Sequence, residues 1–446
     1  MAQMNPEQER KKKGKLLWRI HHWAGLYTGI LIGVLSLTGA LAVFIPEIDA
    51  LIQQHYYGVS SSRGAGVHFG KSLDQLTQTY PDYNFLTIFL PEDPGHAASI
   101  DIAVPDPLTG KANRYYFFVD TGKDELVGSR HHTNSMANYL RQMHVRLYEG
   151  NWGRQLVGLG GIALVVVVVT GLLIYKDFTK RQPYPSIRRQ RGLRILLADW
   201  HKILGISALL FNLVIGLTGA WLGLQPKLMK WFSMKVPNAF TAPVIMDPAA
   251  DKKTTVDWPA AMQAAKKQFP ELEVRAVMPS DDGSNTLVFR GDIAGQVSER
   301  NANTLVLSKT GLQPLFRYDL RNKPASHKFY FIQEALHFGD FGGLTLKILY
   351  ALLGLGSGFL SISGFVVYIS RTDKKVQRRQ GPLKLVFLYT FALVLVLVIA
   401  ALVSLFIGYS QAAFMMAVGI NAGLAGWVGY LVLHYFKRKR KKLALA

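Results

Sequence analysis

Residues 17–45 read LWRIHHWAGLYTGILIGVLSLTGALAVFI, a stretch long and apolar enough to cross a membrane as one helix. It is too long for a removable signal peptide and lacks a small-residue cleavage site, so we expect it to remain as an anchor. Five further stretches have the length and composition of spanning helices: about 152–175, 196–224, 343–369, 383–408 and 412–436. The sequence therefore predicts a mainly α-helical membrane protein with six transmembrane helices.

Basic residues give these helices a direction. The chain of 446 residues is 49% hydrophobic and still carries a formal net charge of +22, which fits apolar spans with basic flanks. Clusters of Lys and Arg fall at every second boundary, within residues 10–15, 176–194, 371–379 and 437–442. The positive-inside rule then predicts a multi-pass protein of the bacterial inner membrane with both termini in the cytoplasm. Since each basic cluster adjoins a span, we expect contact with membrane lipid and no nucleic-acid partner.

The same reading divides the chain into six parts. We expect a cytoplasmic N-terminus and first span (1–45), a periplasmic domain (46–150), and two spans joined by a basic loop (151–224). A second periplasmic domain (225–340), a fourth span (341–370) and a C-terminal part with two spans (371–446) follow. Each periplasmic segment contains one short helix, Ser72–Tyr80 or Trp258–Phe269, followed by extended runs. Both are therefore predicted to be small α+β domains.

An internal repeat relates the two halves. Leu37-Thr38-Gly39-Ala40 recurs unchanged as Leu217-Thr218-Gly219-Ala220, an offset of 180 residues. Later in each half the offset grows to 189 and then 193, as insertions in loops would produce. The matched pairs at these offsets are His21 with His201, Gly25 with Gly205, Thr121-Gly122 with Thr310-Gly311, His144 with His337, and Thr170-Gly171 with Ser363-Gly364. Both halves enter the membrane from the same side, so we expect a parallel repeat with a pseudo-twofold axis along the membrane normal.

Two histidines of each half are matched by this repeat. His21 and His201 fall near the cytoplasmic boundary, whereas His144 and His337 fall near the periplasmic boundary. Histidine inside a membrane usually faces the bundle interior and a functional partner, although an interfacial histidine is the simpler alternative. Twofold symmetry would bring each matched pair together at one depth. Two facing imidazoles suit the axial positions of haem iron, whereas a zinc site needs three or four ligands.

Other residues near these positions have two interpretations each. Gly25, Gly29, Gly33 and Gly205 would make room for a large flat ligand, or would allow close helix packing. Arg154, with Arg141 and Arg146, would pair with haem propionates or with lipid headgroups. No arginine matching Arg154 stands in the Leu336-His337-Phe338-Gly339-Asp340 segment. The remaining histidines considered, which we interpret as structural or interfacial, are His22, His131, His132, His327 and His434.

Several of these motifs together resemble the PepSY-associated transmembrane family. They are Ile20-His21-His22-Trp23-Ala24-Gly25-Leu26 with Leu37-Thr38-Gly39, its counterpart from Trp200 to Gly219, and Met143-His144 with the segment from Gly153 to Leu159. The likeness covers about residues 15–370, and the periplasmic segments resemble PepSY domains. It implies a di-haem siderophore reductase type of protein. On that resemblance, His21, His144, His201 and His337 would bind the iron of two non-covalent haem b groups, and electrons would pass to ferric siderophores or other ferric chelates and release iron(II).

The electron donor is expected to be a separate molecule. No Gly-rich dinucleotide fingerprint follows a predicted strand, and the cytoplasmic loops are too short for a flavin domain. Quinol and a cytoplasmic reductase are the two donors considered. The absence of cysteine excludes disulfides, thiolate metal sites and covalently attached c-type haem. Two alternatives without redox activity are a PepSY-type binding or regulatory membrane protein and an iron-chelate permease.

Overall fold

The computed structural model describes residues 6–52, 54, 58, 67–91, 95–106, 112–175, 186–240, 256–280, 285–298 and 301–372. The chain divides into two compact units. The helical unit comprises Met1–Ile45, Met136–Leu228 and Leu336–Ala446, and the sheet unit comprises Pro46–Ser135 and Met229–Ala335. The expected spans at 383–408 and 412–436 lie outside the described residues. The sheet unit is shorter than the expected domains at 46–150 and 225–340, because the segments that carry His144 and His337 belong to the helical unit.

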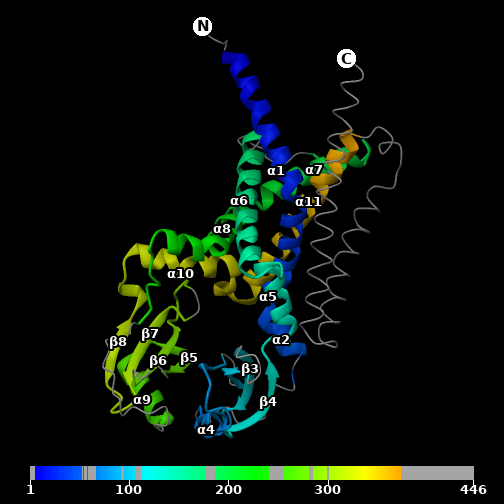
Figure 1. Cartoon of the computed structure of the whole chain (residues 1–446). Coiled ribbons are helices and arrows are strands. Elements are labelled where there is room, and N and C mark those ends of the chain that lie inside the picture. The colour runs from blue at the N-terminus through cyan, green and yellow to red at the C-terminus, as the bar shows by residue number, and fades with distance from the viewer. Residues whose placement is uncertain are drawn as a thin grey trace. The chain divides into compact units, whose positions relative to one another are not determined.

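Four helices in the described part of the chain are long and apolar enough to cross a membrane (Figure 1). They lie in α1 (Pro6–Ala42), α6 (Gly150–Ile174), α8 (Leu209–Trp231) and α11 (Gly343–Thr372). Shorter helices α5 (Met136–Arg146) and α10 (Ala325–Phe338) precede α6 and α11 respectively.

The expected third span differs from the structure. Instead of one helix over 196–224, the chain forms α7 (Leu193–Ser207) and α8, which part at Ala208. The residues before the break include Gly205 and Ser207. Glycine and serine close together are a common cause of helix kinks, because glycine lowers helix propensity and serine competes for backbone hydrogen bonds.

Small residues let the membrane helices approach closely. A Cβ added at Gly161 of α6 would lie 2.5 Å from the backbone nitrogen of Ala220 in α8. The matched contact in the other half is looser, since a Cβ at Gly354 of α11 would lie 3.3 Å from Cβ of Ala40 in α1. Helices in lipid associate through such packing because water supplies no hydrophobic drive between them. Gly161 and Gly354 therefore serve close helix packing.

The sheet unit holds one antiparallel sheet of eight strands in the order β4-β3-β2-β1-β5-β6-β7-β8. The two expected domains thus contribute four strands each and meet where β1 pairs with β5, through Ile88↔Val277 and Phe89↔Ala276. The strands are β1 (Phe85–Phe89), β2 (Ala98–Pro105), β3 (Ala112–Asp120), β4 (Glu125–His131), β5 (Glu273–Pro279), β6 (Thr286–Asp292), β7 (Asn303–Ser308) and β8 (Pro314–Tyr318).

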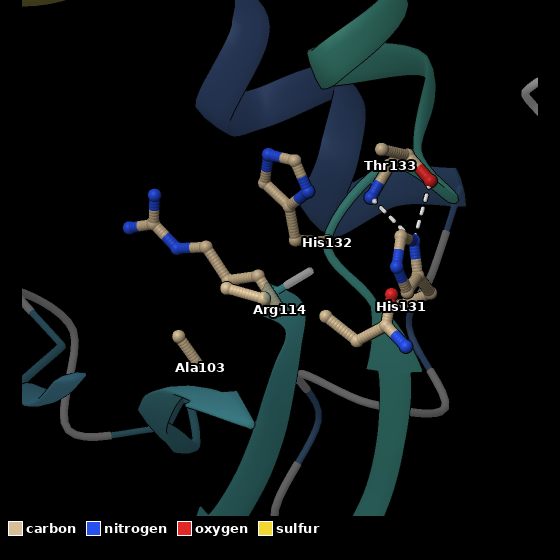
Figure 2. Close-up of a pocket in the computed structure, with 7 residues that line it drawn as sticks. Ala103, Arg114, His131, His132 and Thr133 are labelled. Atoms are coloured by element: carbon tan, nitrogen blue, oxygen red, sulfur yellow. Dashed lines mark hydrogen bonds between the residues drawn. The ribbon is translucent and has the colours of Figure 1, made fainter. Parts of the chain in front are cut away.

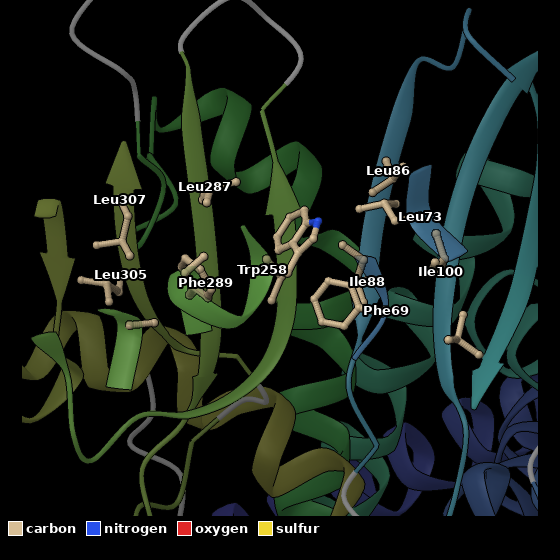
Figure 3. Close-up of a cluster of buried hydrophobic side chains, with 14 of the residues drawn as sticks. Phe69, Leu73, Leu86, Ile88, Ile100, Trp258, Leu287, Phe289, Leu305 and Leu307 are labelled. Atoms are coloured by element: carbon tan, nitrogen blue, oxygen red, sulfur yellow. The ribbon is translucent and has the colours of Figure 1, made fainter. Parts of the chain in front are cut away.

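The two halves of the sheet share a large core cluster (Figure 3). Helices α4 (Gly70–Thr79) and α9 (Trp258–Gln268) both pack into it. The rings of Phe69 and Trp258, which the 189-residue offset matches, lie 5.1 Å apart between their centroids. Burial of the same cluster from both halves predicts that the two sets of four strands fold together. The short helix α2 (Ile45–Ile52) is tied to edge strand β4 by an ion pair between Asp49 and Arg130.

Candidate functional site

The helical unit brings the four repeat-matched histidines together in two pairs. The first pair is His21 on α1 with His201 on α7, whose ring centroids lie 6.5 Å apart with planes at 90°. The second pair is His144 on α5 with His337 on α10, whose centroids lie 6.1 Å apart with planes at 44°. Each pair therefore joins equivalent residues of the two halves, as the symmetry argument predicts.

Tight turns fix the second pair relative to the spans that follow. Between α5 and α6 the backbone takes positive φ at Leu147 and Tyr148, and again at Gly150, the first residue of α6. Between α10 and α11, Gly339 adopts the left-handed conformation at φ 66°, which glycine favours because it has no Cβ. The Tyr350 hydroxyl of α11 then donates to the carbonyl of Leu336, 3.0 Å away, and holds the end of α10 in place.

Each histidine has its Nδ1 atom beside a hydroxyl of a neighbouring helix. In the first pair, His21 Nδ1 lies 3.2 Å from Thr170 Oγ1 and His201 Nδ1 lies 3.0 Å from Ser363 Oγ. In the second pair, Nδ1 of His144 lies 3.1 Å from Thr38 Oγ1, and Nδ1 of His337 lies 2.9 Å from Thr218 Oγ1. The hydroxyl comes from the same half of the chain as the histidine, so each half orients its own two imidazoles.

Open space lies next to the first pair. Gly25 follows His21 by four residues on α1, and Gly205 follows His201 by four on α7, so each glycine shares a helix face with its histidine. A Cβ added at Gly25, Gly29 or Gly205 would meet no atom within 4 Å. This space is what a flat ligand beside the two imidazoles requires. In contrast, Gly33 faces Ser361 of α11, with its added Cβ 3.6 Å from that side chain, and serves helix packing.

The separation of the rings suits a metal held between them. A metal bound at roughly 2 Å to a histidine nitrogen lies about 3 Å from the ring centre, so two opposed rings would be about 6 Å apart. The observed 6.5 Å and 6.1 Å agree with this value. Within the described residues no group of three or more His, Cys, Asp or Glu side chains could hold a metal ion. Two-nitrogen ligation, as in bis-histidine haem, therefore fits the donor set better than a zinc site does.

A basic residue of each half lies on the span that follows the second pair. The Arg154 guanidinium on α6 donates to the carbonyl of Leu222 at 2.8 Å through Nη2, one helical turn beyond Thr218 on α8. Its counterpart at the 193-residue offset is Lys347 of α11, which is only 7% exposed. A search for arginine close to His337 misses this lysine, whereas the offset itself identifies it. A buried cation in a spanning helix is a functional candidate.

Four other histidines, His22, His131, His132 and His327, have local partners. His22 stacks on Trp18 with centroids 4.9 Å apart, and His327 Nδ1 lies 2.9 Å from the Tyr318 hydroxyl. A cavity of about 530 Å³ in the sheet unit is lined in part by Arg114, His131 and His132, and Figure 2 shows these side chains. Partial burial lowers the pKa of His131 below its ordinary value. His434 lies outside the described residues.

Comparison with known proteins agrees with the motifs. Residues 18–371 match the family described as PepSY-associated TM region. An uncharacterized protein of Pseudomonas aeruginosa is 38% identical over 85 residues, which cover 19% of this chain and 21% of that protein. The similarity thus spans about a fifth of the length of the curated relative, and its name states no activity.

Proposed function

This chain belongs to the PepSY-associated TM region family, and on that premise we propose that it is a membrane-bound di-haem reductase of ferric siderophores or other ferric chelates. Its multi-pass character follows from the spanning helices and the family. The observation that carries the redox proposal is the geometry of the two histidine pairs, with ring centroids 6.5 Å and 6.1 Å apart. Each haem b, when bound, supplies a one-electron carrier between the donor and the chelate.

The chain's own residues would hold and tune these groups. His21 with His201 would hold the iron of one haem, and His144 with His337 would hold the iron of the other. All four imidazoles are only partly buried, which leaves surface for a cofactor to cover. Arg154 and Lys347 would place positive charge near the carboxylates of the second haem, where an ion pair in apolar surroundings is stronger than in water.

The basic flanks of the spans support a direction for the electrons. On the positive-inside rule, the first pair would lie near the cytoplasm, and the second pair and the sheet unit would face the periplasm of a bacterial inner membrane. A separate donor, quinol or a cytoplasmic reductase, would be oxidised at the first pair. Each iron(III) in a chelate gains one electron near the second pair and becomes iron(II). The hard oxygen donors of the chelate hold iron(II) more weakly, so the metal is released.

An absorption spectrum of the purified full-length chain, before and after dithionite, tests the cofactor. Pyridine haemochrome analysis should give about two haem b groups per chain, as two bis-histidine sites require. A colourless preparation from haem-replete cells would remove the basis of the proposal and leave the binding or permease alternatives.

A second experiment tests the substrate. Dithionite-reduced protein in vesicles, freed of excess reductant, should be re-oxidised by a ferric hydroxamate siderophore, while a ferrous chelator traps iron(II). A His337→Ala variant should lose this re-oxidation, and a His22→Ala variant, which alters no paired imidazole, should keep it. Reduced haems that ferric chelates leave untouched on both sides would contradict the reductase function even though the haems are present.

A further inference from the structure

Each of the four paired histidines contacts two consecutive residues of a neighbouring helix, a threonine or serine followed by a glycine. We name this pair of residues the hydroxyl–glycine step. The four steps are Thr38-Gly39 under His144, Thr170-Gly171 under His21, Thr218-Gly219 under His337, and Ser363-Gly364 under His201. We infer that these steps are positioning residues, which hold each imidazole as the Nδ1–H tautomer and present Nε2 as the ligating nitrogen. The inference rests on the proposed function and adds to it the residues that determine ligand geometry and basicity.

The direction in which each hydroxyl donates its proton determines the tautomer of the imidazole beside it. A threonine hydroxyl has one proton to donate, and Thr38 Oγ1 donates it to the carbonyl of Val34, 2.8 Å away in its own helix. Thr218 Oγ1 likewise donates to the carbonyl of Val214 at 2.7 Å. The oxygens of these hydroxyls are then left to accept, so Nδ1 of the facing imidazole must be the donor.

The first pair gives the same answer by an independent route. His21 Nδ1 lies 2.9 Å from the carbonyl oxygen of Val167, and a carbonyl can only accept. Ser363 Oγ donates to the carbonyl of Leu360 at 3.1 Å and so accepts from His201. With Nδ1–H committed to a hydrogen bond, Nε2 keeps the lone pair that a metal requires. Such a bond to the second nitrogen also fixes the ring orientation and makes the ligand more basic.

The glycine of each step lets the ring approach. A Cβ added at Gly39 would lie 2.9 Å from Cε1 of His144. The corresponding distances are 3.1 Å for Gly171 to His21, 3.2 Å for Gly219 to His337 and 3.4 Å for Gly364 to His201. Contacts below 3.4 Å are tighter than ordinary packing, so at three of the steps alanine would displace the imidazole. The hydroxyl and the absent side chain act together on the same ring.

Thr38→Val tests the hydroxyl, because valine keeps the shape of threonine but cannot accept the Nδ1–H bond. A less basic ligand stabilises ferric iron less, so the midpoint potential of the second-pair haem should rise while that of the first-pair haem stays unchanged. Thr38→Ser keeps the hydroxyl and should restore the potential. The matched control is Thr28→Val on the same helix, since Thr28 Oγ1 donates to Ala24 O at 2.7 Å and no histidine is its hydrogen-bond partner in the described residues.

Gly39→Ala tests the close approach. Displacement of His144 should lower the occupancy of the second haem to half or less and weaken its low-spin ferric EPR signal. The control is Gly356→Ala in α11, where an added Cβ meets nothing within 4 Å and the other half already has Ala163 at the matched position. Normal haem content in both variants would contradict the role of the glycine.

Nitrogen-15 NMR of histidine-labelled full-length protein reads the tautomer directly. The dithionite-reduced, diamagnetic holoprotein should show four imidazoles protonated at Nδ1, and Thr38→Val should shift one of them. Four imidazoles protonated at Nε2, or a potential that moves equally in Thr38→Val and Thr28→Val, would overturn the inference while the haem spectra stand. If the wild-type chain carries no haem, the proposed function fails, and the same NMR spectrum still decides the tautomer.

Discussion

In the first half of the helical unit, α1 runs unbroken past His21 to Thr38. In the second half, the matched stretch is two helices that part at Ala208, between His201 and Thr218. The hydroxyl–glycine steps are nevertheless present in both halves. The hydroxyl and glycine contacts of the imidazoles are thus repeated in both halves, whereas the helices that carry them are not. The two pairs also differ in the angle between their ring planes, which is 90° in the first pair and 44° in the second. The halves therefore build two similar but inequivalent sites.

The largest expected effect separates the two pairs. Single replacement of His21 or His201 by alanine should abolish the same haem signal and leave about one haem per chain, because one axial ligand alone no longer holds the group. His144→Ala and His337→Ala should instead abolish the other signal. Redox titration followed by absorption would check this. If His21→Ala and His144→Ala removed one common signal, the pairing across the halves would be wrong.

The second-largest effect is expected in the core cluster that the two halves of the sheet unit share. Phe69→Ala and Trp258→Ala should each lower the free energy of unfolding by about 3–5 kcal/mol, because each deletes a large buried ring. Their rings touch, so the double mutant should show a coupling of about 0.5–1.5 kcal/mol. Chemical denaturation followed by tryptophan fluorescence, or by circular dichroism for the Trp258 variants, would measure both. Additive effects in two separate transitions would show that the two four-stranded parts fold independently.

Two glycines matched by the repeat allow the packing of the spans to be compared between the two halves. Gly161→Ala should destabilise the helical unit by about 1–3 kcal/mol, since its Cβ would press on the backbone of α8. Gly354→Ala, at the equivalent place, meets Cβ of Ala40 at 3.3 Å and should cost less. Unfolding in mixed micelles gives the difference. Equal losses of stability in the two variants would show that the contact between Gly354 and Ala40 cannot relax to admit the added methyl group.

The smallest expected effect concerns the two matched cations, Arg154 and the buried Lys347. Arg154→Gln and Lys347→Gln should each lower the midpoint potential of the second haem, because a positive charge nearby favours the reduced state. The shift should correspond to a free energy on the order of 1 kcal/mol. Lys347→Arg keeps the charge and should restore the potential. A shift of the first-pair haem instead would place Lys347 at the other site.

Sequence patterns located the paired histidines better than they predicted the architecture. The histidines were found because the repeat offset preserves their type and position. The extended runs expected from the sequence, at 85–90, 99–104 and 114–119 and at 273–277, 286–290 and 303–307, correspond to β1–β3 and β5–β7. Strands β4 and β8 were not predicted, because they lie at the edges of the sheet, where few side chains are buried and the apolar alternation is weak. The pairing of β1 with β5 depends on contacts almost 190 residues apart, which local periodicity cannot report.

Two features of the site were also hidden. The break at Ala208 lies inside a continuous apolar run, so hydropathy alone reads one span. An arginine motif beside His337 does not predict Lys347, which is a lysine and follows His337 by ten residues, as Arg154 follows His144. The break depends on how the helices are joined, which composition does not encode, whereas the repeat offset does identify Lys347.

The strand order of the sheet unit has a consequence for assembly. Read from either edge, β4-β3-β2-β1 and β8-β7-β6-β5 are the same series, and the antiparallel seam between β1 and β5 is self-complementary. An isologous contact of this kind is what two identical subunits use across a twofold axis. A half-length chain with one set of four strands and two histidines would therefore complete the same sheet, and both histidine pairs, as a homodimer. The present chain has the form of such a dimer joined by a covalent linker.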